Sequence, residues 1–275
     1  MRRFLLAQVT DMHIKAGGKL SYRVVDTASF LARCVAHILK LPQRPDAVLL
    51  TGDLTDFGRP EEYANLERIL EALPMPFFLM PGNHDEPANL RAAFPAHAYL
   101  REGASHVDYA IEDFAVRIVA LDSTIPRESG GRLDDEQLEW LDRTLAARPG
   151  VSAIVALHHP PFWTGIGHMD RMGLANPGAL ERIVARHSQV ERVISGHVHR
   201  PIVTRFGGTV ASTCPGPAHQ VALDLADDAP SRFVMEPPAF QLHLWREGAG
   251  LVTHTAAIGD FAGPYPFYEG GKLID

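Results

Sequence analysis

The sequence predicts an α/β fold in which two β-sheets pack face to face between two layers of helices, a four-layer α/β/β/α sandwich. Short apolar runs rich in β-branched residues, such as 3–9 and 47–50, alternate with segments whose apolar residues recur at helical spacing. This alternation is typical of βαβ units with parallel strands. Toward the end of the chain, strand-like segments predominate, which adds further strands to the sandwich.

Individual elements follow from the same patterns. Amphipathic helices are expected at residues 30–41, 61–73, 135–145 and 177–187. The first stops before Pro42, and Pro60 precedes the second where it suits a first helical turn. Strands are expected at residues 3–9, 47–50, 77–80, 107–111, 116–121, 153–157, 190–194, 241–245 and 252–255.

Short polar clusters follow directly on several of these strands. They are Asp11-Met12-His13, Gly52-Asp53, Gly82-Asn83-His84-Asp85, His158-His159 and Gly196-His197-Val198-His199. Open α/β sheets place ligand-binding groups at the carboxyl ends of their strands, so we expect the clusters to converge. Carboxylate, amide and imidazole donors together suit a group of divalent transition metals. The sequence therefore predicts a metal-dependent hydrolase.

The clusters resemble the signature of the calcineurin-like metallophosphoesterases, which is D-x-H, G-D, G-N-H-[DE], H-H and G-H-x-H in that order. The resemblance implies the same four-layer fold and two metals about 3.5–4 Å apart that clamp a phosphoryl group around a hydroxide. Asp11 and His13 are two residues apart, and so are His197 and His199. On an extended strand end, the two side chains of each pair would therefore face the same side. The resemblance also implies the ligands: bridging Asp53, then Asp11, His13 and His199 for the first metal, and Asn83, His158 and His197 for the second.

The identity of the two metal ions is left open by this ligand set. Mixed oxygen and nitrogen donors suit Fe(II), Mn(II), Zn(II) or Co(II). The set contains no thiolate, which removes the main reason to favour zinc.

Departures from other members of the superfamily narrow the resemblance. Protein phosphatases of this type carry G-D-x-x-D-R-G, and purple acid phosphatases place a metal-bound Tyr three residues after the bridging Asp, where Asp56 stands here. Residues 58–63 look instead like the class III cyclic nucleotide phosphodiesterases. Within that group the chain is most similar to bacterial glycerophosphodiesterases, with further support from residues 212–221 and 262–264.

The resemblance assigns roles beside the metals as well. His84 would stabilise charge on the phosphate or donate a proton to the leaving alkoxide, with Asp85 orienting it. A purely supporting role for His84, as a hydrogen-bond partner of the metal ligands, is the alternative. Asn83 could exchange with a substrate oxygen, and His219 matches a substrate-side histidine. His159 is expected to orient the loop after it rather than to bind metal.

The implied activity is hydrolysis of a small phosphodiester, most simply a glycerophosphodiester. Hydrolysis of 3′,5′-cyclic nucleotides is the alternative activity. A metal-bound scaffold is the non-catalytic alternative, although scaffolds of this fold usually lose the residue equivalent to His84. No motif places Arg59, Arg127 or Arg200 around the phosphate, so a singly charged diester is expected to react better than a monoester. Several side chains could either stack a base or line the pocket wall: Phe162, Trp163, His168 and Met172.

Composition excludes some classes of partner. With 46% hydrophobic and 21% charged residues the chain is typical of a globular protein, and its net charge of −7 argues against a nucleic-acid polymer as partner. The apolar stretch after Arg3 is too short for a signal peptide, and no run reaches the length of a membrane span. We therefore expect a cytoplasmic protein that does not bind membranes. The sequence leaves open whether Cys34 and Cys214 form a disulfide.

The end of the chain predicts assembly. We expect residues 1–221 to form the catalytic core, and residues 222–275 to form a cap, interface segment and tail that complete the same domain. The apolar, proline-rich residues 233–240 have no obvious place in a two-sheet core, and exposed apolar patches usually mark partner surfaces. Related glycerophosphodiesterases use their cap for oligomer contacts, which implies a homodimer or higher homo-oligomer. A cap folded onto its own subunit is the alternative.

Overall fold

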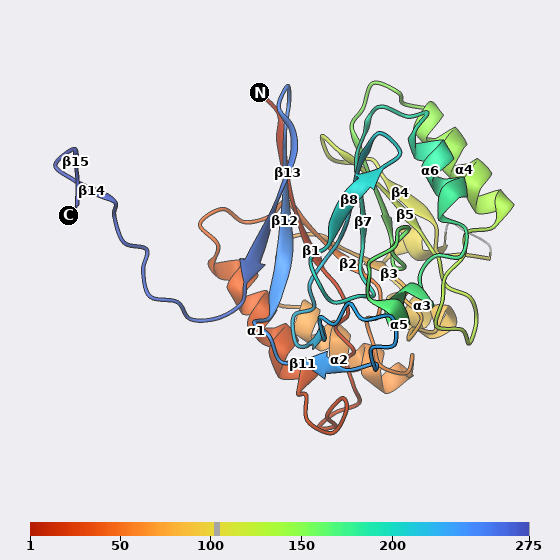
Figure 1. The fold of residues 1–275 in the computed structure, drawn as a ribbon, viewed down its shortest axis with the longest axis horizontal. Helices are drawn as coiled ribbons and strands as arrows, with labels where there is room; N and C mark the ends of the chain where they lie inside the picture. The colour runs from red at the N-terminus through yellow and green to blue at the C-terminus, as the bar shows by residue number, and fades with distance from the viewer. Residues whose placement is uncertain (102–104, 275) are drawn as a thin grey trace.

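The computed structural model describes residues 1–101 and 105–274, and a five-stranded sheet forms one half of its centre (Figure 1). The strand order is β13-β12-β1-β2-β3. β1, β2 and β3 run parallel, whereas β12 is antiparallel to both of its neighbours. The strands span Arg3–Val9 (β1), Ala47–Thr51 (β2), Phe77–Met80 (β3), Ala239–Arg246 (β12) and Gly250–Ala257 (β13).

A six-stranded sheet of order β4-β5-β6-β7-β9-β8 forms the other half. β5, β6, β7 and β9 are parallel, and the two edge strands, β4 and β8, are antiparallel to their neighbours. The strands span Tyr109–Ile111 (β4), Arg117–Leu121 (β5), Ala153–Leu157 (β6), Val190–Ser195 (β7), Val203–Phe206 (β8) and Thr209–Thr213 (β9).

Helices cover the outer faces of both sheets, which confirms the predicted sandwich. α1 (Thr27–Lys40) and α2 (Pro60–Leu70) share a core with β1, β2 and β3, while α4 (Asp135–Ala146) and α6 (Pro177–Val184) share one with β5, β6 and β7. Alternate residues of β5 belong to the two different cores, because a strand turns successive side chains to opposite faces. The short helices are α3 (Pro87–Ala93), η1 (Ala98–Arg101) and α5 (Gly167–Asp170).

Two of the predicted helices end one turn earlier than expected. The predictions at 61–73 and 177–187 are too long, since α2 ends at Leu70 and α6 at Val184. In both places the next turn tightens: the Leu73 N–H donates to Leu70 O (2.9 Å), and the His187 N–H donates to Val184 O (3.0 Å). Such bonds to the third residue back are common where a helix runs out of partners.

Residues after 221 contribute more to the five-stranded sheet than the sequence indicated. Residues 239–257 form β12 and β13, so the cap expected over 222–275 is confined to residues outside these strands. Phe240 is completely buried in the main core, which corrects the expectation that all of 233–240 lies outside it. Within the cap, β11 (Phe233–Val234) pairs with β10 (Gln220–Val221).

The chain ends in a small hairpin, in which β14 (Tyr268–Glu269) pairs with β15 (Lys272–Leu273) at a distance from the main body (Figure 1). Cys34 and Cys214 are both buried free thiols, so they form no disulfide with each other. Among the described residues, no helix combines the length and the apolar character that crossing a bilayer requires.

Candidate metal centre

The predicted ligands lie just beyond the ends of strands from both sheets, and most have an unusual backbone conformation. The φ angles are 55° at Asp11, 45° at His13, 48° at Asp53, 69° at His197 and 53° at His199, a left-handed region that non-glycine residues rarely adopt. The expectation of extended strand ends is therefore wrong here. Tight turns fold the chain back at the sheet edge, and both members of each alternating pair still reach the cluster.

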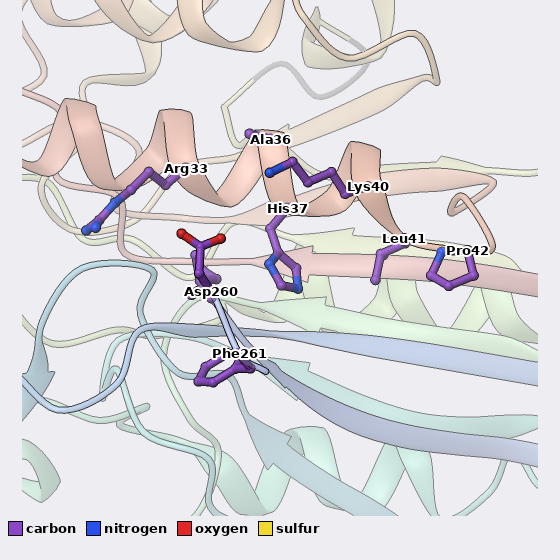
Figure 2. A pocket seen from close by; sticks show the side chains of 10 residues that line it. Arg33, Ala36, His37, Lys40, Leu41, Pro42, Asp260 and Phe261 are labelled. Carbon is purple, nitrogen blue, oxygen red and sulfur yellow. The ribbon is translucent and has the colours of Figure 1, made fainter. Parts of the chain in front are cut away.

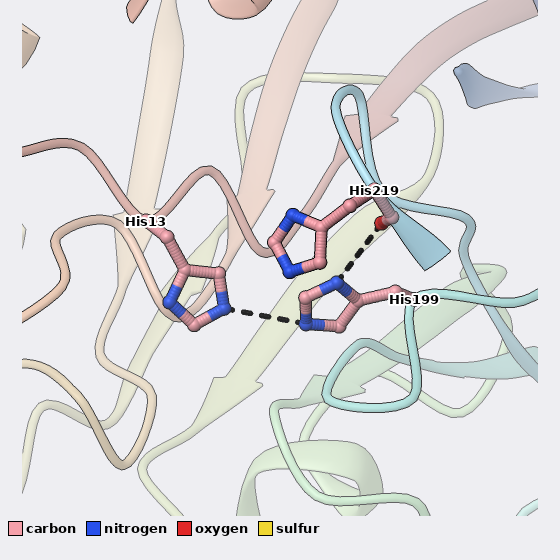
Figure 3. Close-up of side chains that lie close together, drawn as sticks. All are labelled: His13, His199 and His219. Atoms are coloured by element: carbon pink, nitrogen blue, oxygen red, sulfur yellow. Dashed lines mark hydrogen bonds between the residues drawn. The ribbon is translucent and has the colours of Figure 1, made fainter. Parts of the chain in front are cut away.

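Two pairs of imidazoles form the two halves of this cluster. His13 Nε2 lies 3.2 Å from His199 Nε2 (Figure 3), and His158 Nε2 lies 3.3 Å from His197 Nδ1. Asp53 stands between the pairs, with Oδ2 3.6 Å from His13 Nε2 and Oδ1 3.4 Å from His158 Nε2. A carboxylate that bridges two metals needs such a position, with one oxygen directed to each half.

Asp11 and Asn83 complete the two halves. Asp11 Oδ1 lies 3.4 Å from His199 Nε2, and Asn83 Oδ1 lies 3.2 Å from His158 Nε2. The structure thus brings all the predicted ligands together and groups them in the two expected sets. Their coordination of metal ions stays a prediction.

The protonation of the cluster fits divalent metals. Burial and the neighbouring His13 lower the pKa of His199 to about 3, so this ring is neutral and keeps a lone pair at pH 7. Burial also lowers the pKa of His158, but the charge of Asp53 outweighs it and raises the value to about 9. The site therefore attracts positive charge. His197 Nε2 is buried without a hydrogen-bond partner among the described residues, which leaves a free donor for a metal.

The remaining ring nitrogens hold the imidazoles in place. His158 Nδ1–H donates to the carbonyl of Thr51 at 2.8 Å. His199 Nδ1–H donates to the carbonyl of His219 at 3.1 Å (Figure 3). Because a carbonyl only accepts, each bond fixes the tautomer and leaves Nε2 facing the cluster.

Asp56 supports His13 in a similar way, a role that the sequence did not reveal. Its Oδ1 lies 3.3 Å from His13 Nδ1, and its Oδ2 lies 2.5 Å from Lys15 Nζ. Burial raises the pKa of Asp56, but the nearby His13 and Lys15 side chains outweigh it and lower the value to about 2. One feature of the sequence could have indicated this role. Asp56 stands three residues after Asp53, where the purple acid phosphatases place a metal-bound Tyr.

His84 lies at the edge of the cluster and is partly exposed. Its backbone N–H donates to Asp53 Oδ1 at 2.9 Å, and its Nδ1–H donates to the carbonyl of Asp56 at 2.9 Å. These bonds leave Nε2 as the ring nitrogen available to a substrate. The supporting and the catalytic roles of His84 are therefore compatible, since one side of the residue holds the bridging carboxylate and the other lines the cavity.

Asp85 does not orient His84, and its expected role is corrected. Its carboxylate accepts from the backbone N–H groups of Leu54 and Gly82, both at 2.9 Å, and of Thr55 at 3.1 Å. Among the hydrogen bonds of the described residues, none joins it to the His84 imidazole. The loops after β2 and β3 turn these N–H groups inward, so Asp85 ties one ligand loop to the other.

His219 and His159 flank the cluster. The His219 ring centroid lies 4.6 Å from that of His199, and burial followed by the neighbouring His199 lowers the pKa of His219 to about 2, so the ring is neutral. His159 Nδ1 lies 2.8 Å from Ser123 Oγ, and its Nε2 lies 3.3 Å from the carbonyl of Ser129. With both nitrogens so placed, the His159 ring links two loops beside the site.

A cavity of about 400 Å³ opens over the cluster. The Tyr22 ring packs against those of His219 and Phe233, at centroid distances of 5.2 and 4.9 Å. Phe233 thus folds over the cluster of its own chain. His168 and Met172 line the cavity, as one of the two expectations for them had it. The rest of the wall comes from Tyr22, Ser129, Met169, Val221, Ser231, Arg232 and Phe233.

Some expected pocket residues lie elsewhere. Phe162 packs against the core of the six-stranded sheet, and Trp163 is exposed to solvent. Arg59 and Arg200, which no motif places around the phosphate, are not among the residues that line the cavity. Arg200 donates to Glu236 at 2.7 Å, and Arg59 stacks on the Phe57 ring. Arg232, which no motif singled out, lines the cavity instead and supplies a cation at its rim.

Comparison with known families identifies the family of this chain. A family model described as calcineurin-like phosphoesterase matches residues 4–201, which include every predicted ligand. The chain belongs to the calcineurin-like phosphoesterase family.

Curated relatives match this phosphoesterase over nearly its whole length. A protein of Arcobacter nitrofigilis named "Probable glycerophosphodiester phosphodiesterase" is 44% identical over 98% of this chain and 100% of its own. A glycerophosphodiester phosphodiesterase of Enterobacter lignolyticus is 32% identical over 96% of this chain and 95% of its own. A "Probable cyclic nucleotide phosphodiesterase" of Rhodopseudomonas palustris is 35% identical over 91% of both chains.

Solved structures share the fold of this phosphoesterase. A dimetal phosphatase from Danio rerio superposes with a TM-score of 0.63 at 16% identity, covering 94% of this chain and 100% of the other. A purple acid phosphatase from yellow lupin superposes with a TM-score of 0.67 at 17% identity, covering 99% of this chain and 53% of the other. At these identities the likeness concerns the fold alone.

The motif glycines of this phosphoesterase are required by close packing around the ligands. A Cβ added at Gly82 would overlap the backbone nitrogen and Oδ1 of Asp53. A Cβ added at Gly196 would overlap Thr10 Oγ1 and lie 3.0 Å from Asp11 Oδ2. Only glycine lets the two loops approach the ligands so closely.

Proposed function

We propose that this calcineurin-like phosphoesterase is a binuclear metal-dependent phosphodiesterase that hydrolyses a small phosphodiester, most simply a glycerophosphodiester. The main support is the position of Asp53 between two buried histidine pairs at the base of a cavity of about 400 Å³. The cavity size suits a small ester rather than a polymer. The names of the Arcobacter and Enterobacter relatives support the choice of substrate.

The residues of this site would hold two divalent ions, and Fe, Mn, Zn and Co all suit the donors. When bound, such ions supply a hydroxide near neutral pH and neutralise charge on the phosphoryl oxygens. Asp53 would be shared between the sites. The remaining ligands would divide as the geometry groups them, with Asp11, His13 and His199 on one side and Asn83, His158 and His197 on the other.

The chain itself contributes the groups that handle the ester. His84 presents Nε2 to the cavity while its Nδ1–H is held by the carbonyl of Asp56, so the doubly protonated ring can donate from Nε2 to a phosphoryl oxygen or to the leaving alkoxide. Asn83 and His219 would contact the substrate from the same wall. Tyr22 and Phe233 would exclude water from one side of the cavity.

The charge of the cavity supports a diester rather than a monoester. Arg232 is the arginine among the cavity-lining residues that the structure describes, so little protein charge is available for a dianionic phosphate. A singly charged diester needs less compensation. We expect kcat/KM for a bis(aryl) phosphate to exceed that for the aryl monoester, and the reverse order would indicate a phosphatase.

Hydrolysis of 3′,5′-cyclic nucleotides is the second candidate. It is favoured by the stacked pair of Tyr22 and Phe233 at the cavity wall, since aromatic rings of this kind can stack a base. The name of the Rhodopseudomonas relative agrees with it.

A substrate panel tests these proposals. We expect kcat/KM for glycerophosphoethanolamine to exceed that for cyclic AMP by at least tenfold, a difference of about 1.4 kcal/mol in transition-state binding. The opposite order would select the cyclic nucleotide. Lack of turnover of any phosphodiester by a preparation with two bound metals would favour the scaffold role.

Chelation tests the dependence on metal. Dialysis against a chelator should remove close to two ions per chain and abolish turnover, and the ion that restores it would identify the metal. Full turnover by a demonstrably metal-free preparation would refute the proposal. The cytoplasmic location and the formation of a homo-oligomer stay predictions, which cell fractionation and light scattering can test.

A further inference from the structure

His168 is a buried polar side chain in the wall of the cavity, and one of its ring nitrogens has no partner. The residue is 6% exposed, and its Nδ1 is buried without a hydrogen bond among the described residues. The same residue lines the cavity over the metal centre. A buried polar atom without a partner costs free energy, so each one in a native protein requires an explanation. A ligand that enters the cavity and bonds to Nδ1 provides it.

Other atoms of this kind in the cavity already have a role. His197 Nε2 and His219 Nδ1 are also buried without a partner among the described residues. His197 is a predicted metal ligand, and His219 is expected to contact the substrate beside the cluster. A groove of about 480 Å³ beside α1 has no such atom in its described lining residues (Figure 2). His168 is thus an unpartnered side chain of the cavity that still lacks a function.

Hydrogen bonds fix the loop that carries His168. The residue belongs to the short helix α5, which ends at Asp170. The Asp170 carboxylate accepts from the N–H and the hydroxyl of Thr164, both at 2.7 Å, and from the N–H of Gly165 at 3.0 Å. These bonds tie the end of α5 to the turn before it, so the helix is held in one conformation.

Apolar packing fixes α5 relative to the metal centre. Met169, the residue after His168, shares a small core with Val198. Val198 stands between the predicted ligands His197 and His199 in the sequence. A helix packed on the backbone of the ligand loop cannot shift without moving that loop. The position of His168 is therefore set with respect to the metals, as a residue that selects substrates requires.

The His168 imidazole is neutral at pH 7. Burial lowers its pKa, and the nearby charge of Arg171 lowers it further against the opposite effect of Asp170. A neutral imidazole has one nitrogen that donates and one that accepts, according to its tautomer. An alcohol hydroxyl both donates and accepts, so it can bond to Nδ1 in either tautomer. A phosphoryl oxygen only accepts and an ammonium group only donates, so a hydroxyl is the best match.

The place of His168 in the cavity assigns it to the alcohol part of the substrate. Asn83 and His84, from the loop after β3, stand at the metal cluster, where the phosphoryl group would lie. His168 comes from α5 and lines the cavity with Met169 and Met172, whose side chains are apolar. This wall offers a neutral polar atom in apolar surroundings. Such surroundings suit the carbon chain and the hydroxyl groups of an alcohol.

We propose that His168 is a specificity-determining residue that binds a hydroxyl group of the glycerol part of the substrate. The inference rests on the proposed phosphodiesterase function, and it adds a residue that selects the alcohol rather than the phosphate. A diester without this hydroxyl leaves Nδ1 unpaired after the substrate has displaced water from the cavity. A site built to bond a hydroxyl group rejects such an analogue.

Two substrates of equal charge and similar length test the proposal on the metal-loaded protein. Glycerophosphoethanolamine has free hydroxyl groups in its glycerol part, and propyl phosphoethanolamine has none. We expect wild-type kcat/KM to favour the first by about tenfold or more. The ratio should fall below about threefold in His168→Phe, which keeps a ring but no nitrogen. His168→Asn, whose amide can replace Nδ1, should retain about fivefold or more. The matched control is His254→Phe, at an exposed position on β13, which should keep the wild-type ratio.

Binding without turnover separates this inference from the proposed function. Calorimetry on the metal-loaded protein should give a Kd for glycerol phosphate about tenfold or more below that for propyl phosphate, and His168→Phe should remove the difference. If no diester is hydrolysed, the proposed function fails while the Kd ratio still decides the role of His168. A ratio near one in the wild type, or an unchanged ratio in His168→Phe, would overturn the inference. The melting temperature of the ligand-free protein should not fall in His168→Phe, because the substitution removes an unpaired atom. A lower melting temperature with an unchanged ratio would show that His168 is structural.

Discussion

The Asp85→Asn substitution separates a residue that holds the site together from one that takes part in the reaction. The carboxylate accepts backbone N–H bonds from Leu54, Thr55 and Gly82 at 2.9 to 3.1 Å. Hydroxyl groups of Thr55 and Tyr63 donate to it as well, both at 3.0 Å. An amide has nearly the same shape but only one accepting oxygen, so it cannot satisfy this set of donors.

The cost follows from the best orientation of the new amide. Its oxygen would face Leu54 and Gly82, and its NH₂ would face the two hydroxyls, which can rotate to accept. The Thr55 N–H cannot rotate, so it loses its partner at about 1–3 kcal/mol. Burial and the charge of Asp53 raise the pKa of Asp85 to about 6, so removing the negative charge offsets part of this cost. We therefore expect the free energy of unfolding to fall by about 1–2 kcal/mol.

The Asp85→Asn substitution should also lower the affinity for metal, because Asp85 joins the loop that carries Asp53 to the loop that carries Asn83. Loss of a group that supports metal ligands typically costs about 10–100-fold in affinity. The measurements are urea unfolding of the metal-free protein and metal titration, with the exposed Asp113→Asn as the matched control. Unchanged unfolding and metal binding, together with a loss of turnover and a shifted pH profile, would refute this reasoning and restore the orienting role toward His84.

Three further predictions concern separate features. His84→Ala should lower kcat by about 10²–10⁴-fold while two metals stay bound, and a loss of metal in proportion to activity would contradict it. Gly196→Ala should empty the first metal site by displacing Thr10 and Asp11, whereas Gly130→Ala, whose Cβ would meet nothing nearer than 3.6 Å, should retain both ions in elemental analysis. Burial raises the pKa of Glu112, but hydrogen bonds from Arg117 and Arg148 outweigh it and lower the pKa below 4.5. That stabilisation is present above pH 4.5 and lost as the pH falls through the folded value, so Glu112→Gln should reduce the melting temperature at pH 7 and match the wild type in acid.

The fold was predictable where local pattern and burial agree. Strands 3–9, 77–80 and 153–157 begin and end as the sequence indicates, because each is a mainly apolar run bounded by polar or turn-forming residues. The position of β12 was not predictable, because its place between β1 and β13 depends on contacts across more than two hundred residues. Without those contacts, residues 233–240 look like an exposed patch, although Phe240 is buried in the core.

The candidate site was predictable as a set of residues but not as a set of roles. The resemblance of the motifs to a known family named the predicted ligands, and the structure brings these residues together. The motifs could not show that the Asp85 carboxylate accepts hydrogen bonds from backbone N–H groups, or that Asp56 contacts His13. Both contacts depend on how loops from different strands meet. Arg232 and Tyr22 reach the cavity from segments without any motif.

The backbone of the ligands explains why these roles are fixed so firmly. Non-glycine residues in the left-handed region cost on the order of 1–3 kcal/mol each, and five predicted ligands adopt it. The combined strain is comparable to the stability of a whole domain, so the surrounding structure must enforce it. Hydrogen bonds from loop backbone to Asp85, and glycines that admit close contact at 82 and 196, provide that enforcement. The glycines and carboxylates between the ligands are therefore as necessary to the metal centre as the ligands themselves.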